Sequence, residues 1–145
     1  MASFAYTRMK RNLLLGDIHF DTDDIRVAAV MTNTTADTEA DKTFMDQFTT
    51  LDEFDGANYG RIALQNEAVN EDTANDRAEF DADNITFSSI GAGARDIQGL
   101  IVYLHVTNDA DSVPLLWIDT GGFPFTANGG DLVTAWNVEG IAQAT

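Results

Sequence analysis

The stretch DIQGLIVYLHVTNDADSVPLLWIDT, residues 96–120, predicts two β-strands joined by a short polar loop. Side chains alternate between the two faces of a strand. In the first predicted strand, residues 97–106, one face carries Leu100, Val102, Leu104 and Val106, and the other carries Ile97, Gly99, Ile101, Tyr103 and His105. The loop at 108–112 contains two aspartates and an asparagine, which favour a turn in solvent. The second strand, residues 113–120, brings Leu115, Leu116, Trp117 and Ile118.

Both faces of this predicted strand pair are apolar. A strand with one face in water normally alternates apolar and polar residues, so this pair is not a half-solvated edge. We expect one face to meet the core and the other to need a cover. A local helix of the same chain and another subunit are the two candidates for that cover.

Composition limits the class of protein. The 145 residues suit a single domain, and a chain of this length buries about 70% of its unfolded surface. The absence of cysteine excludes disulfides, cysteine-bound metals and thiol catalysis. The net charge of −16 argues against a nucleic-acid partner and against anionic membrane surfaces. No apolar run reaches the roughly 18 residues of a membrane span.

The charge is distributed unevenly along the chain. Arg8, Lys10 and Arg11 are three of the eight basic residues, and no acid precedes Asp17. Residues 1–11 therefore carry +3, and residues 12–145 carry 5 − 24 = −19. We expect residues 1–15 to form a basic arm or a short helix ended by Gly16, attached to a single acidic domain at 16–145.

The rest of the chain predicts short strands. Apolar residues alternate at 25–32, and shorter strands are expected at 59–64, 77–80, 84–88 and 132–136. Residues 43–54 predict a helix, because Phe44, Phe48 and Leu51 recur at helical spacing, and this helix is the natural local cover for the sheet. Asn128-Gly129 predicts a hairpin turn, 66–76 a polar connection and 140–145 a tail. The expected fold is mainly β: an antiparallel β-sandwich with jelly-roll-like connections and one or two short helices.

No catalytic motif or cofactor-binding motif is present in the sequence, and we expect a protein that is not an enzyme and holds no cofactor. Of the two histidines, His105 is expected inside the sheet or at an interface and His19 at the surface. Residues 81–92 begin like a calcium loop, but Thr86 and Ala92 replace the glycine and glutamate of an EF-hand. An irregular calcium site built from several loops stays open beside the simpler interpretation, a solvated acidic face.

Aromatic residues leave a further alternative. Trp117, Trp136, Tyr59 and Tyr103 are expected in the core or at a subunit interface, and a sugar-binding platform is the competing interpretation.

Several ordered motifs resemble one family. They are LLGDI at 14–18, DDIRVAAV at 23–30, LDEF at 51–54, YGR at 59–61, NDRAEFDADNITF at 75–87, IVY at 101–103, LLWID at 115–119 and AWN at 135–137, followed by Gly140-Ile141. In this order, over residues 14–141, they resemble a group of small structural proteins of tailed-phage virions. Some members of that group are similar to capsid decoration, or cement, proteins, which sit on the outside of the phage head, commonly as trimers.

The resemblance implies a non-enzymatic protein on the outer surface of the capsid. It implies two partners, the major capsid protein and further copies of the chain as a homotrimer. We expect the subunit or capsid interface to include the basic residues Arg8, Lys10 and Arg11 and the second strand face, with Ile101, Tyr103, His105 and Trp117. Placement in the tail or neck, a carbohydrate-binding β-sandwich of a tail or fibre, and a small hydrolase are the alternatives.

Overall fold

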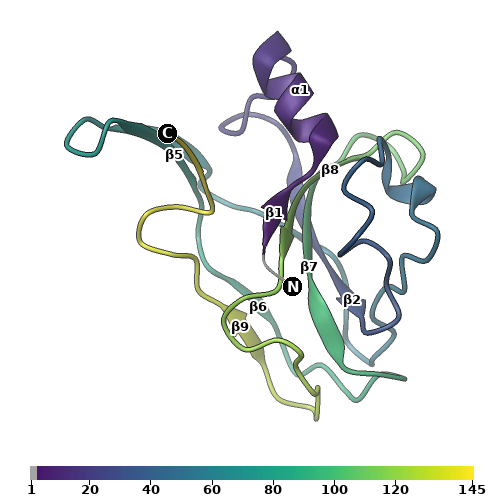
Figure 1. Cartoon of the computed structure of the whole chain (residues 1–145). Coiled ribbons are helices and arrows are strands. Elements are labelled where there is room, and N and C mark those ends of the chain that lie inside the picture. Colours follow the sequence, from purple (N-terminus) through teal and green to yellow (C-terminus); the bar gives the residue numbers. More distant parts are fainter. Residues whose placement is uncertain (1–2) are drawn as a thin grey trace.

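The computed structural model describes residues 3–145, so positions 1 and 2 of the predicted arm lie outside the described residues. Within this described range, one α-helix, one 3-10 turn and ten strands follow one another (Figure 1). Their bounds are β1 Phe4–Ala5, α1 Thr7–Leu15, β2 Ile25–Met31, η1 Met45–Gln47, β3 Ile62–Ala63, β4 Ala68–Asp72, β5 Arg77–Asp81, β6 Ile85–Phe87, β7 Ile97–Leu104, β8 Val113–Ile118, β9 Leu132–Thr134 and β10 Ala142–Ala144. All strand pairs are antiparallel, which confirms the predicted class, mainly β with sandwich-like packing.

The predicted strand pair at 96–120 is the centre of the largest sheet. Its five strands lie in the order β1-β8-β7-β2-β3, so β7 is paired on both sides, with β2 and with β8. Val27, Val102 and Leu116 are cross-strand neighbours on one face, and Ala28, Ile101 and Trp117 are cross-strand neighbours on the other. All six side chains are buried. Both faces of this sheet are therefore core surfaces.

The first face packs against the two-stranded sheet of β6 and β9. Ile85 and Phe87 of β6 and Leu132 of β9 join the cluster that contains Val27 and Val102. Figure 1 shows β6 and β9 side by side across from the large sheet. This layer arrangement is the sandwich-like part of the fold.

The second face is covered by the chain itself, so of the two candidates for this cover the structure shows the local one. Ala36, Met45 and Phe48, from the segment between β2 and β3, pack on Ile101 and Trp117. We call residues 34–51 the cover segment. Within residues 3–145, this segment buries the apolar residues of that sheet face.

The cover segment is not the helix predicted at 43–54. The helical part of this stretch is one 3-10 turn, Met45–Gln47. The α-helix does not form because backbone N–H groups bond to the β7–β8 loop instead. The Met45 N–H donates to the Ser112 carbonyl (2.9 Å), and the Asp46 N–H donates to the Asp109 carbonyl (3.1 Å). Farther along, Phe54 N–H donates to the Ala29 carbonyl on β2 (2.9 Å). Pairing with the sheet therefore replaces the helical hydrogen bonds.

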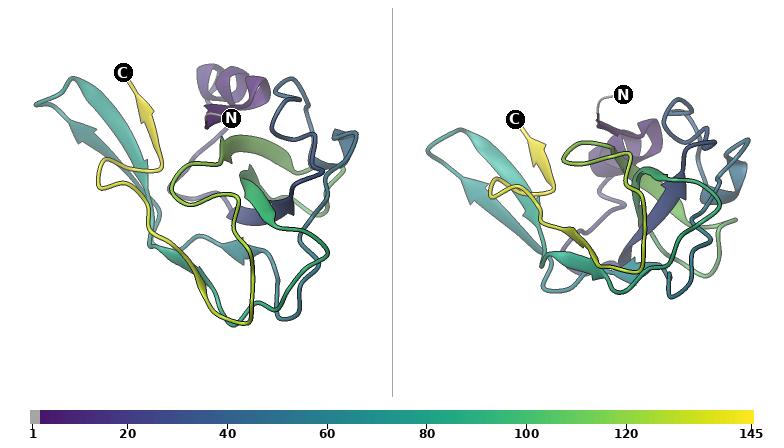
Figure 2. Two further views of the ribbon diagram at one scale, coloured as in Figure 1. Left: turned by 60° about the horizontal axis from the view of Figure 1, so that its bottom comes forward. Right: turned by 90° about the horizontal axis from the view of Figure 1, so that it is seen from below.

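A third sheet, β10-β5-β4, extends away from the large sheet (Figures 1 and 2). It is anchored at its base, where the ring of Phe80 stacks on Phe20 with centroids 4.3 Å apart. Two of its strands were missed in the sequence, since 66–76 was expected as a connection and 140–145 as a tail. Both strands are mostly exposed, so they lack the apolar alternation that reveals a half-buried strand.

The predicted Asn128-Gly129 hairpin is also wrong. β9 pairs with β6, and the Gly129 N–H donates to the Ile90 carbonyl (2.8 Å), so Asn128-Gly129 does not join two paired strands of a hairpin. In contrast, the short helix expected near the N-terminus is confirmed as α1. It ends at Gly16, whose φ of 73° is the left-handed conformation that glycine adopts at little cost.

Gly99 makes room for the Trp117 ring. A Cβ atom at position 99 would lie 2.6 Å from Cζ2 of Trp117 and 2.7 Å from the Ile118 carbonyl oxygen. Because Trp117 is completely buried and the Ile118 carbonyl belongs to the backbone of β8, a methyl group here would force packed groups to shift, and we expect Gly99→Ala to lower the free energy of unfolding by about 1–3 kcal/mol in urea titrations. Gly60→Ala is the matched control, since no atom lies within 4 Å of its added methyl group. Equal stability of the two variants would contradict this packing.

Glu39 holds the cover segment together. Its carboxylate accepts hydrogen bonds from the Thr49 hydroxyl (2.6 Å), the Thr35 hydroxyl (2.7 Å) and the Thr49 N–H (2.8 Å). The Thr49 and Thr35 hydroxyls lower the pKa of Glu39 from 4.5 to about 2.

A lowered folded-state pKa stabilises the fold above the unfolded-state value, and that contribution disappears as pH falls from 4.5 toward 2. We therefore expect Glu39→Gln to destabilise the protein at neutral pH, with a difference from wild type that shrinks over this range in urea titrations. Glu71→Gln, on the exposed strand β4, is the control. A difference that stays constant with pH would argue against the role of this carboxylate.

Candidate functional site

The basic residues predicted from the sequence lie on α1. Lys10 and Arg11 are exposed, whereas Arg8 is half-buried. Leu14, three residues after Arg11 and four after Lys10, is 90% exposed, and it shares their outward helix face. Leu13 and Leu15 are 43% and 56% exposed. We call Lys10, Arg11 and Leu13–Leu15 the α1 surface, which combines positive charge with apolar side chains.

Ile101, Tyr103 and Trp117 do not lie at the surface. Their side chains are almost completely buried beneath the cover segment, so the prediction that they form a subunit or capsid interface is corrected: they form an intramolecular core. The sequence showed that this face needs burial, and the chain supplies the burial itself. Trp117 is thereby also removed from the predicted sugar-binding platform.

His105 follows the last residue of β7 and is half-buried. Its backbone N–H donates to the Asp24 carbonyl (2.8 Å), and its ring lies edge-on to the Tyr103 ring with centroids 6.3 Å apart. His105 is thus at the rim of the sheet, apart from the α1 surface in sequence and in its contacts.

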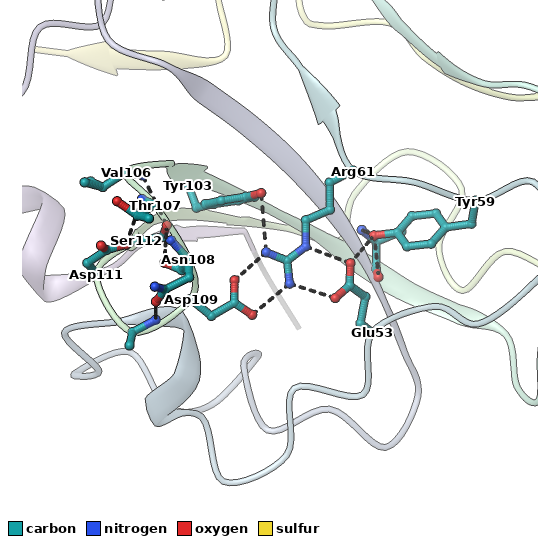
Figure 3. A network of polar contacts seen from close by, with 12 residues as sticks. Glu53, Tyr59, Arg61, Tyr103, Val106, Thr107, Asn108, Asp109, Asp111 and Ser112 are labelled. Carbon is teal, nitrogen blue, oxygen red and sulfur yellow. Dashed lines mark hydrogen bonds and ion pairs between the residues drawn. The ribbon is translucent and has the colours of Figure 1, made fainter.

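A polar network centred on Arg61 joins three segments of the chain (Figure 3). The guanidinium group donates to both carboxylate oxygens of Glu53 (2.7 and 2.7 Å) and to both of Asp109 (2.5 and 2.9 Å). It also lies 5.2 Å from the centre of the Tyr103 ring. The Arg61 hydrogen bond lowers the pKa of Asp109, which keeps this carboxylate charged beside the arginine.

Tyr59 extends this network toward β2. Its hydroxyl donates to Glu53 Oε1 (2.9 Å) and accepts the Ala29 N–H (3.0 Å). Burial, and then the nearby Glu53 carboxylate, raise the pKa of Tyr59, so the hydroxyl keeps its proton. The network therefore fastens the segment that leads into β3 to β2 and to the β7–β8 loop.

The β7–β8 loop is held by its own side chains, as Figure 3 also shows. Asp111 Oδ1 accepts the N–H groups of Thr107 and Asn108 (both 2.9 Å), and these bonds lower its pKa. The Ser112 hydroxyl donates to the Asn108 carbonyl (2.7 Å). The loop expected as a simple solvent turn is therefore a stiff element that anchors Asp109 and the cover segment.

The acidic clusters that suggested calcium are engaged with protein groups. Glu79 pairs with Arg77 (2.8 Å), and Asp83 Oδ2 accepts the Asn66 side-chain amide (2.6 Å). Asp24 pairs with Arg26 (2.6 Å). Within residues 3–145 no group of three or more histidine, aspartate or glutamate side chains is arranged to hold a metal ion. In the same range, no helix has the length and apolar character to cross a membrane.

A cleft of about 650 Å³ lies between the segment after β8 and the segment that contains β9. Its lining includes Phe123, Phe125 and Trp136, with Asp131, Thr134 and Asn137 among the polar residues. A smaller hollow of about 240 Å³ shares Ser3, Ile118 and Ile141 with the cleft and continues along β1. Cavities of this size and mixed lining are typical of small-ligand sites.

Only some of these features carry a signal in the sequence. The charge asymmetry pointed to Lys10 and Arg11, and Trp136 was considered as an aromatic platform residue. The Arg61 network was missed, because Glu53, Arg61 and Asp109 are far apart in the chain and no local motif joins them. The cleft was missed because its two walls come from segments with no regular period.

Comparisons with protein-family models, with curated proteins and with solved structures find no match to this chain.

Removing Arg61 should leave two neighbouring carboxylates without their shared cation. We expect Arg61→Met, which keeps the aliphatic stem, to lower the free energy of unfolding by about 2 kcal/mol in urea titrations at neutral pH. Arg26→Met is the control: its ion pair with Asp24 is more exposed, and it should cost less than about 1 kcal/mol. A smaller loss at Arg61 than at Arg26 would contradict a structural role for the network.

Proposed function

We propose that this chain is a non-enzymatic structural protein of a phage virion, a capsid decoration protein that binds the outer surface of the head and stabilises it. The ordered motifs over residues 14–141 that resemble small tailed-phage virion proteins support the proposal. Its partners are the major capsid protein and further copies of itself, arranged as a homotrimer.

The α1 surface is the observation that carries this proposal beyond the resemblance. Three of the eight basic residues lie on one helix of a chain whose net charge is −16, next to leucines at the surface. Burial of Leu14 at a contact removes apolar surface from water and so favours binding. Lys10 and Arg11 add electrostatic attraction to an acidic protein surface. In this proposal the α1 surface contacts the capsid, while Arg8, which is half-buried, lies outside that surface.

The rigid body of the protein suits this role. Acidic copies placed side by side on a shell repel one another, although salt screens this repulsion beyond roughly 8–10 Å. Apolar burial at the contacts must therefore outweigh the repulsion, and we expect the assembly to be only weakly sensitive to salt. A domain whose sheet is buried on both faces keeps its shape without the shell.

The proposal places the chain on the outside of phage heads. Cryo-electron microscopy of purified particles should show this fold repeated over the outer surface of the capsid, with α1 toward the shell. Density only in the tail or neck, or no density for this chain, would overturn the proposal.

The α1 surface can be tested by binding to heads stripped of this protein. The variant Lys10→Glu/Arg11→Glu and the variant Leu14→Asp should each bind at least about tenfold more weakly in co-sedimentation. Val138→Asp is the control for Leu14→Asp, since Val138 is 95% exposed and lies far from α1 in sequence. Full binding by the α1 variants would place the contact elsewhere.

A carbohydrate-binding β-sandwich is the second candidate, and the aromatic cleft favours it. Trp136 takes the place of the buried Trp117 as the platform residue in this alternative.

A further inference from the structure

The aromatic residues of the cleft are held in place by hydrogen bonds to neighbouring segments. Trp136 donates its backbone N–H to Asn84 Oδ1 and its ring Nε1–H to the Asp83 carbonyl, each at 2.9 Å. Phe125 is fixed by two backbone bonds with Ile97, at 2.8 and 2.9 Å. The orientation of the Trp136 ring is therefore set before any ligand arrives, which lowers the entropy cost of stacking against it.

Polar groups in the cleft retain hydrogen-bonding capacity. Asp131 uses Oδ1 to accept the Ser89 N–H (2.7 Å), and Asn137 uses Oδ1 to accept the Glu139 N–H (3.0 Å). Each bond fixes the side chain through one atom and leaves a second atom, Asp131 Oδ2 or Asn137 Nδ2, for another partner. Thr120 and Thr134 also line the cleft. The lining thus combines aromatic residues with side chains that can accept or donate hydrogen bonds.

The charge of the cleft selects among ligands. Its lining contains Asp131 and, among residues 3–145, no lysine, arginine or histidine. The whole chain is strongly acidic, so phosphorylated, sulfated or carboxylated ligands are repelled. A suitable ligand is uncharged, presents one apolar face to an aromatic ring and carries hydroxyl groups around its edge. Sugar rings have this combination of surfaces.

We propose that the cleft lined by Phe123, Phe125, Trp136, Asp131 and Asn137 binds a neutral saccharide, with a sugar ring stacked on Trp136 and its hydroxyls bonded to Asp131 and Asn137. This site does not depend on the proposed attachment to a capsid, because it is built within one chain. A head-binding protein and a free protein would both carry it.

Tryptophan fluorescence can test the site directly. The chain has two tryptophans, and Trp117 is buried beneath the cover segment. The variant Trp117→Phe therefore leaves Trp136 as the single tryptophan that emits. A glycan array probed with the full chain identifies neutral sugars, and titration of Trp117→Phe with such a sugar should change the Trp136 emission and saturate. Isothermal titration calorimetry of the wild-type chain supplies the same affinity if Trp117→Phe does not fold.

Variants separate the cleft from the rest of the surface. Asn137→Ala and Trp136→Phe should each weaken saccharide binding by about tenfold or more, because they remove a ligand hydrogen bond and the larger stacking surface. Val69→Ser, on the exposed strand β4, is the control and should bind as the wild type does. Circular dichroism confirms that the variants are folded.

The proposal is overturned by either of two results. One is that no neutral saccharide binds in the array, by calorimetry or by fluorescence, including the case in which only an extended peptide binds. The other is that Asn137→Ala and Trp136→Phe, both folded, bind saccharide as tightly as the wild type. Neither result bears on attachment to heads, which is measured with the α1 variants.

Discussion

The β2–β7–β8 sheet has to be buried on both faces, and the rest of the structure depends on this constraint. Successive side chains of these strands, which point to opposite faces of the sheet, are mostly apolar. Exposing either face to water is therefore unfavourable. The β6–β9 layer buries one face, and the cover segment buries the other. A chain of 145 residues thereby builds two cores around one sheet, which leaves little apolar surface for a partner at the sheet itself.

Polar groups hold the irregular parts against this sheet. Arg61 joins the Glu53 and Asp109 segments, Glu39 closes the cover segment through Thr35 and Thr49, and Asp111 stiffens the β7–β8 loop. These acidic side chains stabilise the fold through such bonds, in addition to giving the chain its negative charge. The two surfaces proposed for binding are the α1 surface and the aromatic cleft. One combines positive charge with leucines, and the other is uncharged apart from an aspartate, so the two suit different partners.

Regular elements with a strong local signal could be predicted. Helix α1 has Gly16 in the left-handed conformation at its end, and β2, β7 and β8 follow apolar runs bounded by polar turns. Predictions failed where long-range pairing overrides local pattern. Residues 43–54 have helical spacing, yet the N–H groups of Met45 and Asp46 bond to the β7–β8 loop. Strands β4 and β10 are mostly exposed and have no apolar period to reveal them.

The sequence by itself determined that the sheet is apolar on both faces, that α1 is basic on an acidic body, and that the chain is mainly β. These properties follow from residue type and from spacing along one segment. Only the tertiary structure decided that the cover is the same chain, that Arg61 lies between Glu53 and Asp109, and that Trp136 lines a cleft while Trp117 does not reach the surface. Each of these features depends on contacts between residues that are distant in the chain. The sequence pattern of one segment does not predict the free energy of such contacts.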